Sequence, residues 1–277
     1  MDYYFSVFIF LLFFGGFSLF LYILYSLYRK KKLEDISKLP FLKEYEDVLL
    51  KTPHYRKLSE KDKKDLQKSI LLFVNTKEFI GVHLSVTMEM KLIVAFYACL
   101  LLLHVSRENC YENLKTIIIY PNTVISKEVK SNGGITTSER FLLEGQSAND
   151  TVVISWHEAK KEAYHLRHNN VIIHEFAHEI DFLDGEIDGV PPMQTSKYNS
   201  WATTLSKNFN ALNKVAVKNR EWGKYKLLGS YAATNEAEFF AVITELFFEK
   251  PHSLKHNFPD LYNELLGFYK IDTAELI

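Results

Sequence analysis

The motif His-Glu-Phe-Ala-His at residues 174–178 constrains the fold more than any other part of this chain. Residues four apart in a helix lie on one face, so both imidazoles can bind one Zn²⁺ ion. Glu175 directly follows the first histidine and can act as a base toward water on that metal. Asn170 is a suitable N-cap and Gly185 a suitable stop, so we predict a helix between them. The structural alternative is an amphipathic helix whose two histidines lie four apart by chance.

A long uncharged stretch, residues 3–28, precedes the basic cluster at residues 29–32. About 20 apolar residues in a helix cross a bilayer, and Tyr3 and Tyr28 stand where interfacial aromatics belong. The basic flank stays in the cytoplasm under the positive-inside rule. We therefore predict an uncleaved single-pass anchor in the inner (cytoplasmic) membrane, with the bulk of the chain in the cytoplasm. A cleaved signal peptide is the alternative, but Met1-Asp2 provides no basic n-region and no A-x-A precedes the basic cluster.

Composition sets further limits. The 277 residues are 47% apolar, enough for a substantial core in one large domain or two small ones. A net charge of −1 offers no electrostatic argument for a nucleic-acid partner. Cys99 and Cys110 form neither a C-x-x-C pair nor a metal-ligand cluster, and we interpret them as reduced thiols. We predict an anchor over residues 1–32, a juxtamembrane linker over 33–58 and a folded domain over 59–277.

The second strongly apolar stretch lies at residues 86–105. Its centre, from Leu92 to Leu103, contains twelve uncharged residues. Twelve residues are short for a membrane span and typical of a buried core helix, which is our prediction. The alternative is a second membrane segment, which would place the histidine-bearing helix on the other side of the membrane.

The rest of the chain predicts a mixed fold. A helix is expected from about Glu60 to Phe73, with Ser59 as its cap. Residues 131–149, including a turn at 132–134, and residues 184–200 are expected to be loops, and residues 201–277 mostly helical. β-branched runs predict strands, and these are Thr116–Tyr120, Thr123–Ile125 and Thr151–Trp156. The expected class is therefore α+β, with a small sheet packed beside helices.

A catalytic zinc ion usually takes three protein ligands and leaves one position for water, so a third ligand is needed. No H-x-x-G-x-x-H extension follows His178, which argues against the peptidase class that has one. Asp181 is too close on the same helix to complete the tetrahedron comfortably. It is better placed as an acceptor for an imidazole N–H or as a packing anchor. The other acids near the motif are Asp184, Glu186 and Asp188.

A separate apolar, periodic segment at residues 235–248 offers a better third ligand. Glu238 stands at the edge of its apolar stripe, where a carboxylate needs a cation or hydrogen bonds. The alternative is that Glu238 closes a capping box with Asn235. Glu245, two turns later on the same face, is the competing ligand.

Three motifs in this order resemble the Mlc titration factor family, bacterial zinc metallopeptidases of the gluzincin type. They are Val171–Asp181, Gly189–Pro192 and Tyr231–Ala241, with weaker matches at residues 98–102, 118–121 and 152–156. The similarity covers about residues 40–270, which leaves out the anchor.

The resemblance implies roles for individual residues. The metal ligands would be His174, His178 and Glu238, holding one Zn²⁺ per chain. Glu175 would be the general base, and Tyr231 would assist the transition state. The implied function is zinc-dependent hydrolysis of peptide bonds, with an aminopeptidase-like action on short peptide substrates.

The N-terminal anchor departs from the family pattern. The best-known member is a soluble cytoplasmic protein that binds a sugar-responsive transcriptional repressor. The resemblance therefore also implies an alternative function, a membrane-tethered binding protein that sequesters a transcriptional regulator.

Overall fold

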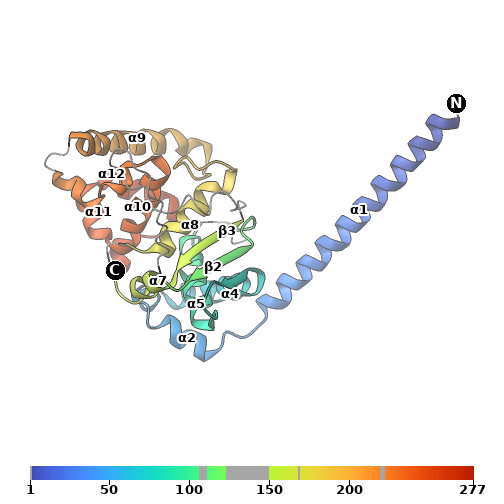
Figure 1. The fold of residues 1–277 in the computed structure, drawn as a ribbon, viewed down its shortest axis with the longest axis horizontal. Coiled ribbons are helices and arrows are strands. Elements are labelled where there is room, and N and C mark those ends of the chain that lie inside the picture. The colour runs from blue at the N-terminus through green and yellow to red at the C-terminus, as the bar shows by residue number, and fades with distance from the viewer. Residues whose placement is uncertain (1, 106–110, 123–149, 168, 219–221) are drawn as a thin grey trace. The chain divides into compact units, whose positions relative to one another are not determined.

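The computed structural model describes residues 2–105, 111–122, 150–167, 169–218 and 222–277. The chain divides into two compact units, residues 1–41 and 42–277. The second unit is mostly helical and contains one small parallel sheet, which confirms a small sheet beside helices (Figure 1). Three predicted features lie outside the described residues, namely the strand at 123–125, the loop at 131–149 with its turn, and the state of Cys110.

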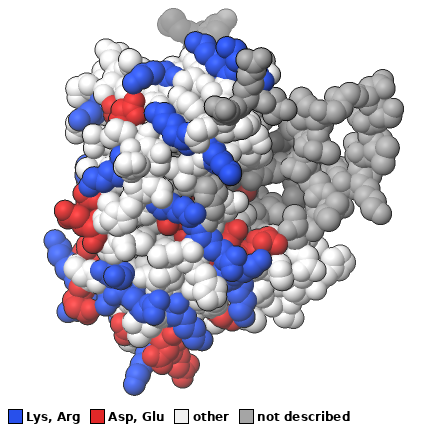
Figure 2. Space-filling view, turned by 90° about the vertical axis from the view of Figure 1, so that its left-hand side faces the viewer, with Lys and Arg blue, Asp and Glu red and all other residues white. Residues whose placement is uncertain are grey.

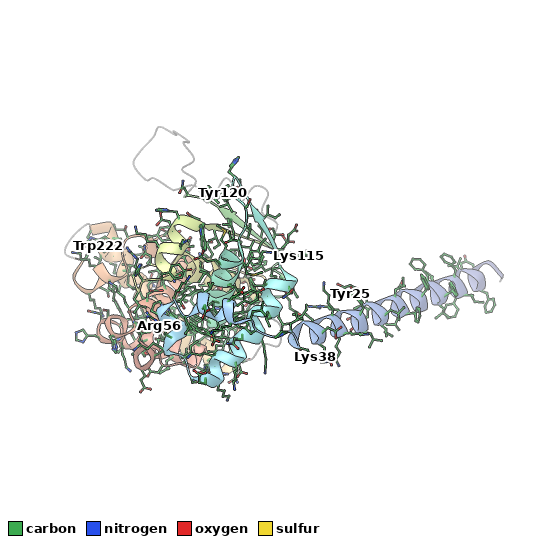
Figure 3. All side chains as sticks on the ribbon, turned by 90° about the horizontal axis from the view of Figure 1, so that it is seen from below. Tyr25, Lys38, Arg56, Lys115, Tyr120 and Trp222 are labelled. Carbon is green, nitrogen blue, oxygen red and sulfur yellow. The ribbon has the colours of Figure 1, made fainter. Side chains whose placement is uncertain are left out.

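Helix α1 (Asp2–Ser37) makes up most of the first unit. Among the described helices it alone is long and apolar enough to cross a membrane, with a mean hydropathy of 2.6 in its apolar window. Figure 3 shows side chains, Tyr25 among them, projecting on all sides of this helix. A helix that is apolar all round is suited to lipid or to a protein core, and the large apolar residues of α1 from Tyr4 to Tyr28 are exposed. The basic cluster at 29–32 continues the same helix.

Helices α2 (Lys43–Leu49) and α3 (Pro53–Lys57) lie in the stretch expected to be a linker. Leu49, Tyr55 and His54 are fully buried, and α2 packs against the later helix α5 (Met88–Leu101). The structure thus differs from a solvated linker here, because a few large side chains within a charged sequence enter the core. Burial lowers the pKa of His54 to about 4, so its ring is neutral at pH 7.

The two helices that follow, α4 and α5, agree closely with the helices predicted from the sequence. Helix α4 (Glu60–Thr76) starts after Ser59, whose hydroxyl accepts from the Asp62 N–H at 3.1 Å. Helix α5 is buried from Met90 onward, which confirms the core-helix prediction for residues 86–105. Each fully buried large apolar side chain contributes about 1.5–3 kcal/mol, so α5 is a major source of stability.

The sheet has the order β1-β2-β3, with all described strands parallel. Strands β2 (Thr116–Tyr120) and β3 (Thr151–Ser155) match the prediction, except that Trp156 starts helix α7 (Trp156–Ala163). Alternate residues of both strands are buried. In the register of the two strands, buried Ile117 pairs with Val152 and buried Ile119 with Ile154. Strand β1 (Glu78–Gly81) was not predicted.

Most of the remaining described chain is helical, as expected, and the predicted loop at 184–200 is confirmed over residues 185–194, after which a helix begins at Thr195. Helix α8 (Val171–Asp181) packs against α5, strand β3 and helix α10 (Glu236–Glu249), so it lies inside the unit (Figure 1). The other elements are η1 (Phe182–Asp184), α9 (Thr195–Lys218), η2 (Gly223–Leu227), η3 (Tyr231–Ala233), α11 (Pro251–Asn257), α12 (Pro259–Tyr269) and α13 (Thr273–Leu276).

Charged side chains of both signs share the molecular surface. Figure 2 shows Lys and Arg spread over one face with Asp and Glu among them. This mixture agrees with the net charge of −1.

Candidate metal centre

The start of helix α8 is held by hydrogen bonds to side chains. Asn170 is the N-cap, and its side-chain oxygen accepts from the Ile173 N–H at 3.2 Å. Glu162 accepts from the Val171 N–H at 2.7 Å. Glu245 accepts from the Asn170 N–H, also at 2.7 Å. Because the first N–H groups of a helix have no partners within it, these bonds fix where α8 begins and hence where its histidines lie.

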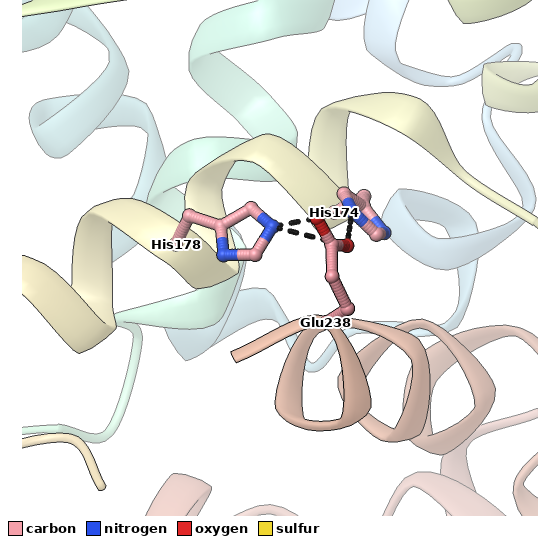
Figure 4. Close-up of side chains that lie close together, drawn as sticks. All are labelled: His174, His178 and Glu238. Atoms are coloured by element: carbon pink, nitrogen blue, oxygen red, sulfur yellow. Dashed lines mark hydrogen bonds and ion pairs between the residues drawn. The ribbon is translucent and has the colours of Figure 1, made fainter. Parts of the chain in front are cut away.

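The structure brings together the three predicted ligands (Figure 4). His174 Nε2 and His178 Nε2 lie 3.3 Å apart. The Glu238 carboxylate comes from α10, and its Oε2 lies 3.0 Å from His174 Nε2 and 3.5 Å from His178 Nε2. One donor atom from each of the three residues thus faces a common position between the two helices.

The sequence left two alternatives for Glu238, a metal ligand or a capping partner of Asn235. Its backbone N–H donates to the Asn235 side chain at 2.8 Å, so Asn235 caps α10. The Glu238 carboxylate, however, points to the histidines (Figure 4). The cap and the contact with the imidazoles therefore coexist, because one uses the main chain of Glu238 and the other its side chain.

Glu245, the competing ligand, lies on the other side of the His174 ring. Its Oε1 is 2.6 Å from His174 Nδ1, and its side chain is 8% exposed. Residues 238 and 245 are two turns apart on the same face of α10, so one helix supplies a carboxylate to each nitrogen of His174. Glu245 is not in the group of donors that converge with His178.

The two carboxylates dominate the electrostatics of His174. Burial alone lowers the pKa of this imidazole, but hydrogen bonds to Glu238 and Glu245 outweigh burial and raise it to about 9. Positive charge is therefore strongly favoured beside these carboxylates. A cation bound at Nε2 has to compete with the proton there, so its affinity should rise with pH.

The two residues predicted to act on the substrate flank this group. Glu175 is half-buried on α8, directly after His174. Tyr231 lies in η3 just before α10, 40% exposed, with its ring centroid 5.8 Å from that of His174. The structure thus places Tyr231 beside the ligand group although it is seven residues from Glu238 in the sequence.

Of the two roles predicted for Asp181, imidazole acceptor or packing anchor, the structure shows the second. Its buried carboxylate accepts from the Gly189 N–H at 2.8 Å, and the Gly189 carbonyl accepts from Trp201 Nε1 at 3.0 Å. Gly189 has φ +80°, and a Cβ there would lie 2.6 Å from the Glu236 carbonyl oxygen. Asp181 therefore anchors the loop that passes the start of α10, and only glycine fits at residue 189.

The donor set fits Zn²⁺ on geometric grounds. Two atoms at about 2.0–2.1 Å from a tetrahedral zinc ion lie about 3.3 Å apart. The separations at this centre are 3.0, 3.3 and 3.5 Å. Two imidazole nitrogens and a carboxylate oxygen are also a known ligand set of catalytic zinc, with a fourth position left for water. The His-Glu-x-x-His helix and a distant glutamate together define the class of metal-dependent peptidases.

The chain belongs to the glucose-regulated metallo-peptidase M90 family, which matches residues 26–270. It is 32% identical to an uncharacterized protein from Synechocystis sp. over 226 residues, 79% of this chain and 80% of that protein. It is 28% identical to Mlc titration factor A from Serratia proteamaculans over 223 residues, 78% of this chain and 83% of that protein. Mlc titration factor A from Yersinia pestis is 29% identical over 160 residues, covering 56% and 58%. These findings confirm the resemblance seen in the motifs.

Proposed function

We propose that this protein is a zinc-dependent peptidase of the gluzincin type, with an aminopeptidase-like action on short peptides. The observation that carries the proposal is the convergence of His174, His178 and Glu238, with donor atoms within 4.8 Å of one another. Membership of a metallo-peptidase family supports the same reaction class. A single Zn²⁺ per chain is the expected cofactor.

Each residue then has a defined chemical task. A bound Zn²⁺ supplies a Lewis acid that favours deprotonation of water and polarises a carbonyl. Glu175 accepts the proton of the attacking water at its carboxylate and delivers it to the leaving amine. The Tyr231 hydroxyl donates a hydrogen bond to the oxyanion. An extended substrate can pair with a sheet edge, and β3 lies at an edge of the described sheet and packs against α8.

The proposed function predicts metal-dependent turnover. The full chain, purified in detergent and loaded with zinc, is expected to cleave members of a peptide library. A chelator should stop cleavage, and added Zn²⁺ should restore it. If the action is aminopeptidase-like, N-acetylated versions of the same peptides should resist cleavage, because they have no free amino terminus. Absence of cleavage across the library by zinc-loaded protein would refute a peptidase function.

The name of the Serratia and Yersinia relatives, Mlc titration factor A, supports a second proposal. In this alternative the domain is a membrane-tethered binding protein that sequesters a transcriptional regulator. Zinc content does not separate the two proposals, because a structural metal would also be retained. The peptide-library assay does, since only the peptidase turns over peptide.

We also propose that α1 is a single membrane anchor and that the folded unit lies in the cytoplasm. Support comes from the exposed apolar surface of α1 and the basic cluster at 29–32 that follows it. In inside-out vesicles, protease is expected to digest the C-terminal tag of the full chain. Protection of that tag, with digestion only after detergent is added, would reverse the proposed orientation.

A further inference from the structure

Helix α10 carries a carboxylate on the side of His174 that faces away from the other two ligands. Glu245 Oε1 lies 2.6 Å from His174 Nδ1, whereas Glu238 and His178 both approach Nε2. The two ring nitrogens are distinct, and a hydrogen bond at one of them decides which tautomer the ring adopts. We propose that Glu245 is a positioning residue, which holds the His174 proton on Nδ1 and keeps Nε2 for the metal. The inference deepens the proposed function and depends on the same centre.

The Glu245 carboxylate is itself held rigidly. Its Oε2 accepts from the Asn170 N–H at 2.7 Å, at the start of the helix that carries His174. The same carboxylate therefore joins the N-cap residue of the helix to a side chain one turn further on. Because the side chain is 8% exposed, solvent competes little for these bonds. Rotation of the His174 ring is thus tied to the position of the main chain of α8.

The other histidine has no comparable support in the described part of the chain. His178 Nδ1 is buried and has no hydrogen-bond partner among the described residues. The two imidazoles of the motif therefore differ in the hydrogen bonding of Nδ1, a difference that the motif itself does not reveal. Of the two imidazoles, a substitution of Glu245 should therefore affect His174 directly and not His178.

A second carboxylate on α10 provides a matched control. Glu249 is one turn beyond Glu245 on the same face and is 3% exposed. It accepts from the Asn170 side-chain amide at 2.8 Å and from the Arg167 N–H at 3.1 Å. Each of the two glutamates thus contacts two nitrogen atoms in or just before the first turns of α8, but only Glu245 contacts a predicted metal ligand.

The test compares Glu245→Gln with Glu249→Gln in the full chain in detergent. A glutamine has one acceptor oxygen where glutamate has two, so each variant leaves one donor without its acceptor. Both variants should therefore lose thermal stability, Glu249→Gln the less, because burial raises the pKa of Glu249 to about 8 and glutamine resembles its neutral form. The Zn²⁺ dissociation constant, from competition with a chromophoric chelator, should rise about 10–100-fold in Glu245→Gln and stay within about threefold in Glu249→Gln. Equal affinities of the two variants, whether both unchanged or both weakened, would overturn the proposal.

A second measurement covers the case in which a variant does not fold. In the zinc-loaded wild-type chain with ¹⁵N-labelled histidine, the His174 signals should show a proton on Nδ1 and the metal on Nε2. A metal on Nδ1 would overturn the proposal. Both measurements read metal binding and not turnover. A protein that binds zinc with the expected difference between variants but cleaves no peptide would refute the proposed function and leave this inference standing.

Discussion

Glu175→Gln is expected to lower kcat for peptide hydrolysis by at least about 100-fold, within the range for loss of a general base. Glutamine keeps the size of the side chain but cannot accept and return the proton of the attacking water. Zinc content should stay near the wild-type value, because Glu175 is not among the converging donors. The measurement pairs single-turnover cleavage of a short peptide with metal analysis of the same sample.

Glu179→Gln is a suitable control for this variant. Glu179 lies one turn beyond Glu175 on the same helix, and burial together with the nearby Glu175 charge raises its pKa to about 7. A neutral side chain is therefore already partly populated at this position, and glutamine resembles it. The control should keep kcat within about threefold of wild type. Equal losses in the two variants would mean that local charge, and not proton transfer, explains the effect of Glu175.

The part of the centre that lies within one helix could be predicted from the sequence. His174 and His178 are four residues apart, and Asn170 supplies the cap, so local rules alone place both imidazoles on one face. The same holds for α5, whose twelve uncharged residues are too few for a membrane span. Such predictions succeed because the interactions that decide them act within one turn or one element.

Features that depend on contacts between distant segments were harder to predict. Spacing left Glu238 and Glu245 as rival ligands, because both lie on one face of α10. Only the packing of α10 against α8 separates them, one at each nitrogen of His174. Glu249, the last residue of α10, is buried and accepts a hydrogen bond from Asn170 at the start of α8. The sequence does not predict this contact, since a glutamate at the end of a helix is usually solvated.

The same reason explains the differences elsewhere in the fold. Residues 33–58 read as a charged linker, yet Leu49 and Tyr55 are fully buried, because α2 and the Tyr55 ring pack against α5. Strand β1 has four residues and owes its conformation to pairing with β2, so its own sequence carries little β pattern. Spacing left Asp181 as either an imidazole acceptor or a packing anchor, because its partner, the Gly189 N–H, becomes close only when the loop folds back.

Glu238→Gln is expected to raise the Zn²⁺ dissociation constant by more than about 100-fold, the upper range for residues that only support a ligand. The amide oxygen is neutral and binds a divalent cation more weakly than a carboxylate does. The fold should survive, because the cap of α10 uses the Glu238 main-chain N–H and not its side chain. Competition titration and metal analysis after dialysis measure the loss.

Glu236→Gln is the matched control, since Glu236 is exposed in the first turn of the same helix and is not among the converging donors. It changes the charge near the helix start by the same amount but removes no converging donor, so it should bind zinc as wild type does. The expected order of affinity is wild type and Glu236→Gln, then Glu245→Gln, then Glu238→Gln. If Glu245→Gln bound Zn²⁺ more weakly than Glu238→Gln, the two roles would be exchanged, with Glu245 as the metal ligand and Glu238 as the residue that positions His174. The separation of 3.5 Å between Glu238 Oε2 and His178 Nε2 argues for the order given, because a ligand has to approach both imidazoles at once.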